Sequence, residues 1–195
     1  MELIQAAAYH ATTPMAGWDG AAWTDCVAMG DFHTFDRFIT ERTFGLKKRV
    51  LTTVSPIPSA YQALRDPSGR TYLITSESPD FHGSTNYMNS YLILQADYLF
   101  EVLTLQKVQN SAGVDISSTK VPVAEYFGDM ERYSGETSRT GSYARYSVMS
   151  IQLPIASADH VNTDTVLRAS GEEYEVTEVL PLLKVLDIKA VKREG

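Results

Sequence analysis

The sequence predicts a mainly β protein made of two duplicated small antiparallel β-barrel or sandwich units joined by a long arm. Two observations lead to this fold class: a motif of glycine, tyrosine and threonine that occurs twice, and the alternation of apolar and polar residues that follows each glycine. A third observation, a polar stretch without a sustained apolar period, separates the copies. The predicted divisions are an N-terminal segment (1–40), a first β-unit (41–108), an arm (109–147) and a second β-unit (148–195).

The repeated motif reads "GRTYLITSESPD" at 69–80 and "GEEYEVTEVLPL" at 171–182. Glycine tolerates positive φ, so each copy is expected to begin at the tip of a hairpin. The tyrosine and the aliphatic residue two positions later then face the same side of a strand, and the proline either ends the ladder or lies at its edge. The shared positions are Gly69 and Gly171, Tyr72 and Tyr174, Ile74 and Val176, Thr75 and Thr177, and Pro79 and Pro181.

A second block supports the duplication. Residues 49–60, "RVLTTVSPIPSA", match 147–158, "SVMSIQLPIASA", with Val50 on Val148. Two matching blocks in the same order favour duplication over chance. Each copy therefore holds about three or four short strands around tyrosine and aliphatic residues, which suffices for a small barrel or an open sandwich.

The first forty residues are rich in alanine, glycine and aromatic residues. The stretch "DFHTFDRFITERTFG" (31–45) is interpreted as a helix or strand that leads into the first unit. The stretch "YLFEVLTLQKV" (98–108) favours a strand by its content of valine, threonine and aromatic residues, although a helix is also compatible with it.

Composition limits the class of protein. The chain is 44% hydrophobic and 21% charged, as in folded soluble proteins, and no apolar run reaches the roughly 18 residues of a membrane span. A net charge of -7 disfavours a free nucleic-acid binder. The single cysteine, Cys26, cannot form an internal disulfide, so nothing indicates a secreted, disulfide-bonded scaffold. Together these observations predict a soluble intracellular product without a membrane partner.

The sequence shows no catalytic signature. Cys26 and His33 are the closest approach to a thiol nucleophile, but no family motif surrounds them, and a buried, inert Cys26 is the expectation. The histidines are scattered, and neither a metal-ligand spacing nor a phosphate-binding loop occurs. We therefore predict no catalytic residue, no metal site, no cofactor and no enzymatic activity.

The arm is the candidate interaction site. It interleaves arginines with tyrosines, which stack on bases but are also the residues that protein interfaces prefer. The acidic composition favours a protein interface. The candidate interface residues are Tyr126, Phe127, Arg132, Tyr133, Arg139, Tyr143, Arg145 and Tyr146.

The second copy resembles a known family. The turn and strand "SGEEYEVTEVLPL", followed by "KVLDIKAVKRE", are similar to the ending of the head-closure (stopper, or head–tail joining) connector proteins of tailed bacteriophages. The stretches "GLKKRVLTTV" and "GRTYLIT" of the first copy share the likeness. Because a typical member is one small barrel and two are predicted here, the place in the connector stays open between stopper, adaptor and neck.

The resemblance implies a structural virion protein, assembled in the host cytoplasm. Its subunits would form a homo-oligomeric ring that seals the portal and joins the tail. The implied partners are the portal or adaptor protein, the tail proteins, and packaged DNA that passes through the lumen without sequence-specific binding. Two alternatives remain open: a tandem β-barrel module that binds nucleic acid or carbohydrate, and an enzyme of unrecognised type that uses Cys26 and a histidine.

Overall fold

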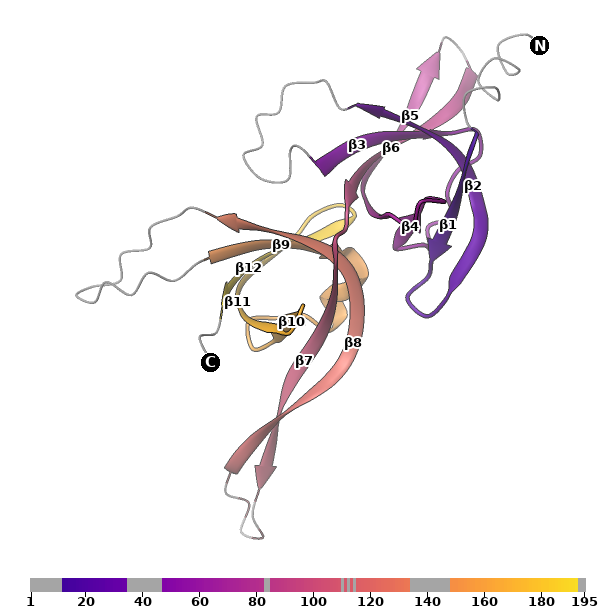
Figure 1. Ribbon diagram of the computed structural model, residues 1–195. Coiled ribbons are helices and arrows are strands. Elements are labelled where there is room, and N and C mark those ends of the chain that lie inside the picture. The colour runs from indigo at the N-terminus through magenta and orange to yellow at the C-terminus, as the bar shows by residue number, and fades with distance from the viewer. Residues whose placement is uncertain are drawn as a thin grey trace.

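Two antiparallel β-barrels make up the part of the chain described by the computed structural model, which comprises residues 12–34, 47–82, 85–109, 111, 113, 115–133 and 148–192. The first barrel closes from strands β1 (Thr13–Trp18), β2 (Trp23–Thr34), β3 (Lys48–Thr53), β4 (Ala63–Arg65), β5 (Thr71–His82) and β6 (Thr85–Gln95). The second closes from β7 (Tyr98–Gln109), β8 (Asp115–Tyr133), β9 (Val148–Pro154), β10 (Val166–Ala169), β11 (Glu172–Pro181) and β12 (Val185–Lys192). The predicted fold class, two small antiparallel β-barrel units, is confirmed (Figure 1).

The two barrels share one topology. Around the first barrel the strands follow the order β1-β2-β3-β6-β5-β4, and around the second β7-β8-β9-β12-β11-β10. Each strand of the second barrel is therefore equivalent to the strand whose number is lower by six, so that β7 corresponds to β1 and β12 to β6. A short 3-10 helix, η2 (Ile155–Asp159), follows β9. The common order supports the duplication that the repeated motif predicts.

The glycine and tyrosine of the motif occupy equivalent places. Gly69 and Gly171 end the turns before β5 and β11 with φ of 87° and 81°, a backbone conformation that glycine adopts without strain. Tyr72 pairs with β4 and Tyr174 with β10, and both side chains are buried. The tyrosine hydroxyls donate to carboxylates, Tyr72 to Asp66 at 3.1 Å and Tyr174 to Glu172 at 2.8 Å, as buried tyrosines require.

The threonine of the motif marks a β-bulge in both copies. The pairing register shifts between Ile74 and Ser76 in β5 and between Val176 and Glu178 in β11. The Thr75 hydroxyl donates to a carbonyl of β6, and the Thr177 hydroxyl to a carbonyl of β12, each at 3.0 Å. A bulge bends its strand and tightens the local twist, which helps a small sheet to close.

The upstream block matches in a different register. The sequence comparison aligns Val50 with Val148, but in the barrels Arg49 and Met149 are equivalent. Each of these two residues pairs with a residue of the next strand, β6 or β12, and that residue in turn pairs with the aliphatic residue of the motif. The alignment is therefore offset by two residues. An offset of two keeps every side chain on the same face of a strand, so the apolar pattern could not reveal it.

The predicted divisions differ from the structure. Residues 13–34, assigned to an N-terminal segment, form β1 and β2 of the first barrel, and residues 115–133, assigned to the arm, form β8 of the second. The stretch 98–108, which the prediction placed in the first unit, belongs to the second barrel through β7. The barrels are joined by Ala96 and Asp97 between β6 and β7, and not by a long arm. Residues 134–147 lie outside the described residues.

Each barrel encloses its own apolar core. The fully buried side chains of the first include Met15, Leu51, Tyr72, Tyr91 and Ile93. Those of the second include Phe100, Ile151, Leu153, Leu186 and Ile188. Complete burial of one such side chain contributes about 1.5–3 kcal/mol, so both barrels have the means to be stable units.

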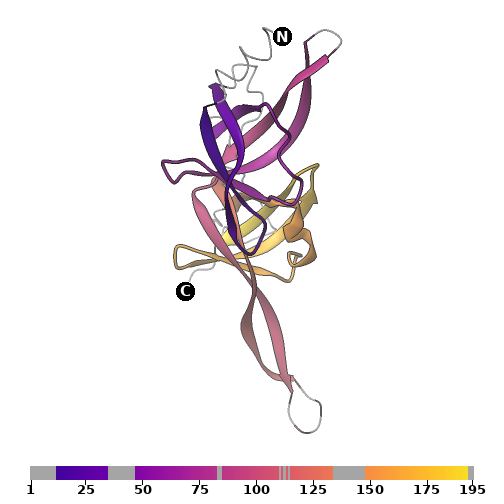
Figure 2. The same ribbon diagram turned by 90° about the vertical axis from the view of Figure 1, so that its right-hand side faces the viewer.

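A long hairpin projects from the second barrel. Strands β7 and β8 pair from Tyr98 and Gly128 out to Gln109 and Asp115, whereas β10 contacts β7 only near the barrel. Figures 1 and 2 show this pair of strands running far beyond the barrel as a twisted ribbon. Within the described part of the chain, no helix has the length and apolar character needed to span a membrane.

Candidate functional site

Of the predicted interface residues, the three whose side chains the structure describes do not form one surface. Tyr126, Phe127 and Arg132 are described with their side chains, all on β8. Arg132 is exposed, near the end of the strand that pairs with β9. Tyr133 pairs with β9 through its backbone, but its side chain, like all of Arg139, Tyr143, Arg145 and Tyr146, lies outside the described residues.

Tyr126 is a core residue of the second barrel. Its side chain is buried, and its hydroxyl lies 2.7 Å from Nδ1 of His160. Burial raises the pKa of the Tyr126 hydroxyl, and the nearby carboxylate of Asp159 adds to the shift. Tyr126 is predicted to contact a partner protein, whereas in the structure its side chain packs inside the second barrel. A tyrosine that alternates into a barrel has the same sequence signature as one that faces a partner.

Phe127 packs between the two barrels. Its ring lies 5.8 Å from that of Trp18 in an edge-on arrangement and 5.5 Å from that of Trp23, measured between centroids. The two tryptophans, on β1 and β2, are 5.5 Å apart. Such geometries are the favoured ones for aromatic pairs. Phe127 is predicted to contact another protein, and in the structure it contacts the first barrel of its own chain.

A guanidinium group completes this aromatic cluster. The Arg65 guanidinium lies 3.8 Å from the centroid of the Trp23 ring and 5.9 Å from that of Phe127, within the range of cation–π attraction. Among the described residues, the buried Nε1 of Trp18 and Nε of Arg65 have no hydrogen-bond acceptor. These two donors reduce the net stabilisation that the cluster provides, because burial of an unpaired polar group costs free energy.

A lysine forms a second link between the barrels. Lys47 directly precedes β3. Its ammonium lies 2.8 Å from Oδ1 of Asp129 on β8 and 3.0 Å from Oδ2 of Asp97, which lies in the connection between β6 and β7. The Asp129 side chain is fully buried, and this burial raises its pKa against the opposing effect of Lys47. For Asp97 the hydrogen bonds from Gln95 and Lys47 outweigh burial, so its pKa is lowered. The connection and both barrels are thereby held together at one point.

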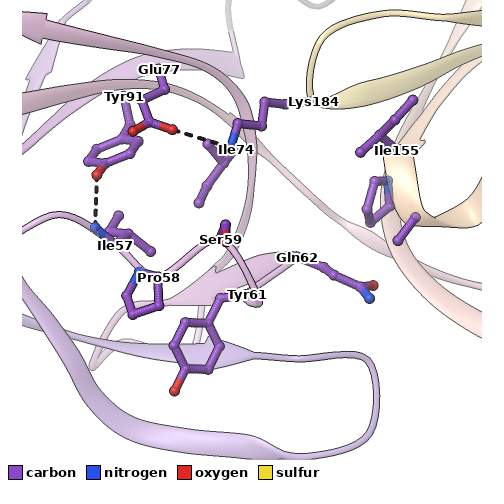
Figure 3. Close-up of a pocket in the computed structure, with 12 residues that line it drawn as sticks. Ile57, Pro58, Ser59, Tyr61, Gln62, Ile74, Glu77, Tyr91, Ile155 and Lys184 are labelled. Carbon is purple, nitrogen blue, oxygen red and sulfur yellow. Dashed lines mark hydrogen bonds and ion pairs between the residues drawn. The ribbon is translucent and has the colours of Figure 1, made fainter.

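A small cavity lies between the two barrels. Figure 3 shows it between Ile57, Ile74 and Tyr91 of the first barrel and Ile155 of the second, with Glu77 and Lys184 paired at its edge at 3.2 Å. Its volume is about 80 Å³. Pockets for small-molecule ligands are usually above about 300 Å³, so this cavity has room for a few water molecules but not for a ligand.

The ribbon is braced where it leaves the second barrel. Lys120 on β8 pairs with Glu173 on β11, and Arg168 on β10 donates to Glu101 at 2.8 Å and to Glu173 at 3.0 Å. Farther out, Leu105 and Val108 are exposed. The charge network fixes the direction of the ribbon, and the outer part of the ribbon carries apolar side chains that the chain leaves exposed to water.

Cys26 is exposed and not buried, so that prediction is wrong. The pairing of β1 with β2 shifts register between Met15 and Gly17, which leaves extra residues of β2 unpaired. Cys26 lies there with φ of 52°, and the irregular backbone turns its side chain to solvent. The side chain of His33 is not among those described, and no group of histidine, cysteine and carboxylate residues in the described part of the chain could hold a metal ion.

Sequence reasoning missed one repeated pair. Gly30 and Asp31 on β2 correspond to Gly128 and Asp129 on β8, since Asp31 pairs with Thr52 and Asp129 with Gln152 at equivalent places. The signal was present as "MGDF" and "FGDM". A Cβ on Gly128 would lie 2.6 Å from the carbonyl oxygen of Gln152, so only glycine lets β9 pass this close.

Comparison with models of protein families and with curated proteins found no match.

Proposed function

We propose that this protein is a structural virion subunit of a tailed bacteriophage, part of the head–tail connector that seals the portal and joins the tail. The observation that carries the proposal is its architecture: two copies of one small barrel, fixed to each other, with a braced ribbon that projects from the second barrel. The resemblance of the second copy to head-closure proteins supports the same function.

The features of the surface suit a building block. Ribbons with exposed apolar side chains can lie across neighbouring subunits, and contacts between different surfaces of identical subunits generate rings. The net charge of -7 would keep a ring from holding DNA that must slide through it. In this proposal the ring contacts the portal or adaptor protein on one side and tail proteins on the other, and DNA passes its lumen.

The function can be tested with the purified chain. We expect light scattering and negative-stain images to show closed rings, and a gel-shift assay with duplex DNA to show no retention at physiological salt. The matched variant shortens the ribbon: residues 107–118 are replaced by Asn-Gly, because Gln106 and Thr119 face each other and suit a two-residue turn. This variant should fold and lose ring formation.

The results separate the alternatives. A monomeric wild-type chain that retains duplex or single-stranded oligonucleotide would replace the connector proposal with the binding-module function. Rings that form equally well without the outer ribbon would show that the ribbon has no part in assembly.

A further inference from the structure

The turn between β11 and β12 presents an unusual apolar tip. The exposed fractions of Leu180, Leu182 and Leu183 are 51%, 44% and 88%. Single exposed apolar residues are common, but three within four positions, at the end of β11 and in the turn that follows, form a concentrated apolar surface. Leu183 in particular has almost its whole side chain in water. We name residues 180–183 the leucine tip.

The leucine tip is held in place. The Leu182 amide donates to the Val185 carbonyl at 2.8 Å, which closes the turn, and the Ile155 amide donates to the Lys184 carbonyl at 3.0 Å. The Lys184 ammonium pairs with Glu77 of the first barrel at 3.2 Å. The tip therefore loses little conformational freedom when it binds, which is the condition under which a small apolar contact gives useful affinity.

The same chain carries a cleft of matching character. It lies between the β1–β2 turn and β8, and is lined by Trp18, Gly20, Ala21, Pro122, Val123, Ala124 and Glu125. Figure 1 shows the β1–β2 turn beside β8. The cleft measures about 340 Å³. The cleft is wide open to solvent, so an apolar side chain of another molecule can enter it without any rearrangement of the chain.

Charge is complementary between the two surfaces. The leucine tip carries the Lys184 ammonium beside it, while Glu125 lines the cleft and Asp19 lies in the adjoining β1–β2 turn. Glu125 has no ion-pair partner among the side chains that the structure describes. Asp19 accepts backbone hydrogen bonds from Ala22 and Ala21, which lower the pKa of its carboxyl further below the ordinary value. Because an ammonium has three donors, Lys184 can keep Glu77 and still pair with a carboxylate at the cleft, as Lys47 pairs with both Asp97 and Asp129.

We infer that the leucine tip of one subunit docks into the cleft between the β1–β2 turn and β8 of a second copy of this chain. The tip is tied to β5 and η2 on its own subunit, so it cannot leave them to reach its own cleft. Two different surfaces of identical chains make a head-to-tail contact, which propagates into a ring when its rotation closes. The inference rests on the proposed ring and specifies the contact between its subunits.

The test uses two variants that disable opposite halves of the contact. Leu183→Asp places a charge on the tip, and Val123→Asp places one in the cleft; both positions are exposed in the subunit, so both variants should fold. Each alone should be monomeric, with association at least about tenfold weaker than in the wild type. Mixed in equal amounts, they should form a species of two chains and nothing larger, because one intact tip meets one intact cleft.

Controls and outcomes are defined by the same assay. Met29→Asp changes an apolar residue outside both surfaces that is exposed to about the same degree as Val123, and this variant should still form rings. Ala21→Glu supplies a second cleft variant on a turn, should Val123→Asp disturb β8. Rings that persist in Leu183→Asp and in both cleft variants overturn the inference and leave the connector proposal standing. A mixture that stays monomeric while the wild type forms rings also overturns it. A wild-type chain that is itself monomeric overturns the proposed ring, and this contact with it.

Discussion

Removal of the Phe127 side chain should uncouple the two barrels. Phe127 is the residue of the second barrel that packs against Trp18 and Trp23 of the first. Its structural equivalent in the first barrel is Met29, which precedes the matching Gly–Asp pair and is exposed. The duplication thus supplies a matched control: Phe127→Ala removes an inter-barrel contact, whereas Met29→Ala removes an exposed side chain from the same topological position.

The size of the effect follows from the packing. Truncation of a fully buried phenylalanine costs about 3–5 kcal/mol. Phe127 is only partly buried, and water that enters the vacated space can accept hydrogen bonds from Nε1 of Trp18 and Nε of Arg65, which now lack acceptors. We therefore expect a loss of about 2–3 kcal/mol, which corresponds to a decrease in Tm of roughly 4–12 °C.

Calorimetry measures the effect and its character. The wild-type barrels should unfold in one transition, while Phe127→Ala should broaden or split it, because each barrel retains its own core. Met29→Ala should stay within about 0.5 kcal/mol of the wild type, as exposed substitutions usually do. A Phe127→Ala protein with a single transition and the Tm of Met29→Ala would refute the inter-barrel role of the aromatic cluster.

Three further outcomes are expected from urea unfolding. Tyr174→Phe should cost about 0.5–1.5 kcal/mol, because the hydrogen bond to Glu172 is lost while the ring stays, and a cost as large as that of an alanine substitution would contradict this division. Gly128→Ala should cost 3 kcal/mol or more, roughly the upper end for overpacking, since its Cβ would meet backbone; a neutral result would mean that β9 lies farther away. Asp129→Asn should gain stability relative to the wild type as pH rises above about 4. Burial raises the folded pKa of Asp129, so the stability that the protonated carboxyl gives the wild type is lost as pH rises through that pKa, whereas the amide of the variant does not titrate. Lys47 keeps Asp97 in this variant, and a relative gain at low pH instead would show that the pKa is lowered.

The repeat could be predicted from sequence because local chemistry fixes it. Gly171 needs a positive φ, Tyr174 needs a buried ring with a hydroxyl partner, and Thr177 caps a bulge. Each requirement restricts the residue type at one position, so duplication left a readable trace. The order of strands around the barrel is not restricted in this way. It depends on pairings between distant segments, which a periodicity of two does not encode.

The predicted arm differs from the observed β8 for a physical reason. β8 belongs to the barrel core only near Tyr126 and pairs with β9 only from Asp129 onward. Its earlier residues form a two-stranded ribbon with water on both faces, and such a strand has no apolar alternation to detect. A polar segment between two periodic ones therefore looked like a linker. The exposed Cys26 was missed because a bulge between β1 and β2, and not hydrophobicity, decides where its side chain points.

The two copies have kept one arginine and given it different neighbours. Arg65 and Arg168 each follow the leucine that pairs with the tyrosine of the motif. In the first barrel Arg65 lies over Trp23 and Phe127, so it helps to fix one barrel to the other. In the second, Arg168 donates to Glu101 and Glu173, so it braces the base of the ribbon. A duplicated position thus stabilises the joint within the subunit in one copy and the projecting element in the other. Both are places where the chain must stay rigid if the ribbon and the leucine tip are to meet neighbouring subunits at fixed angles.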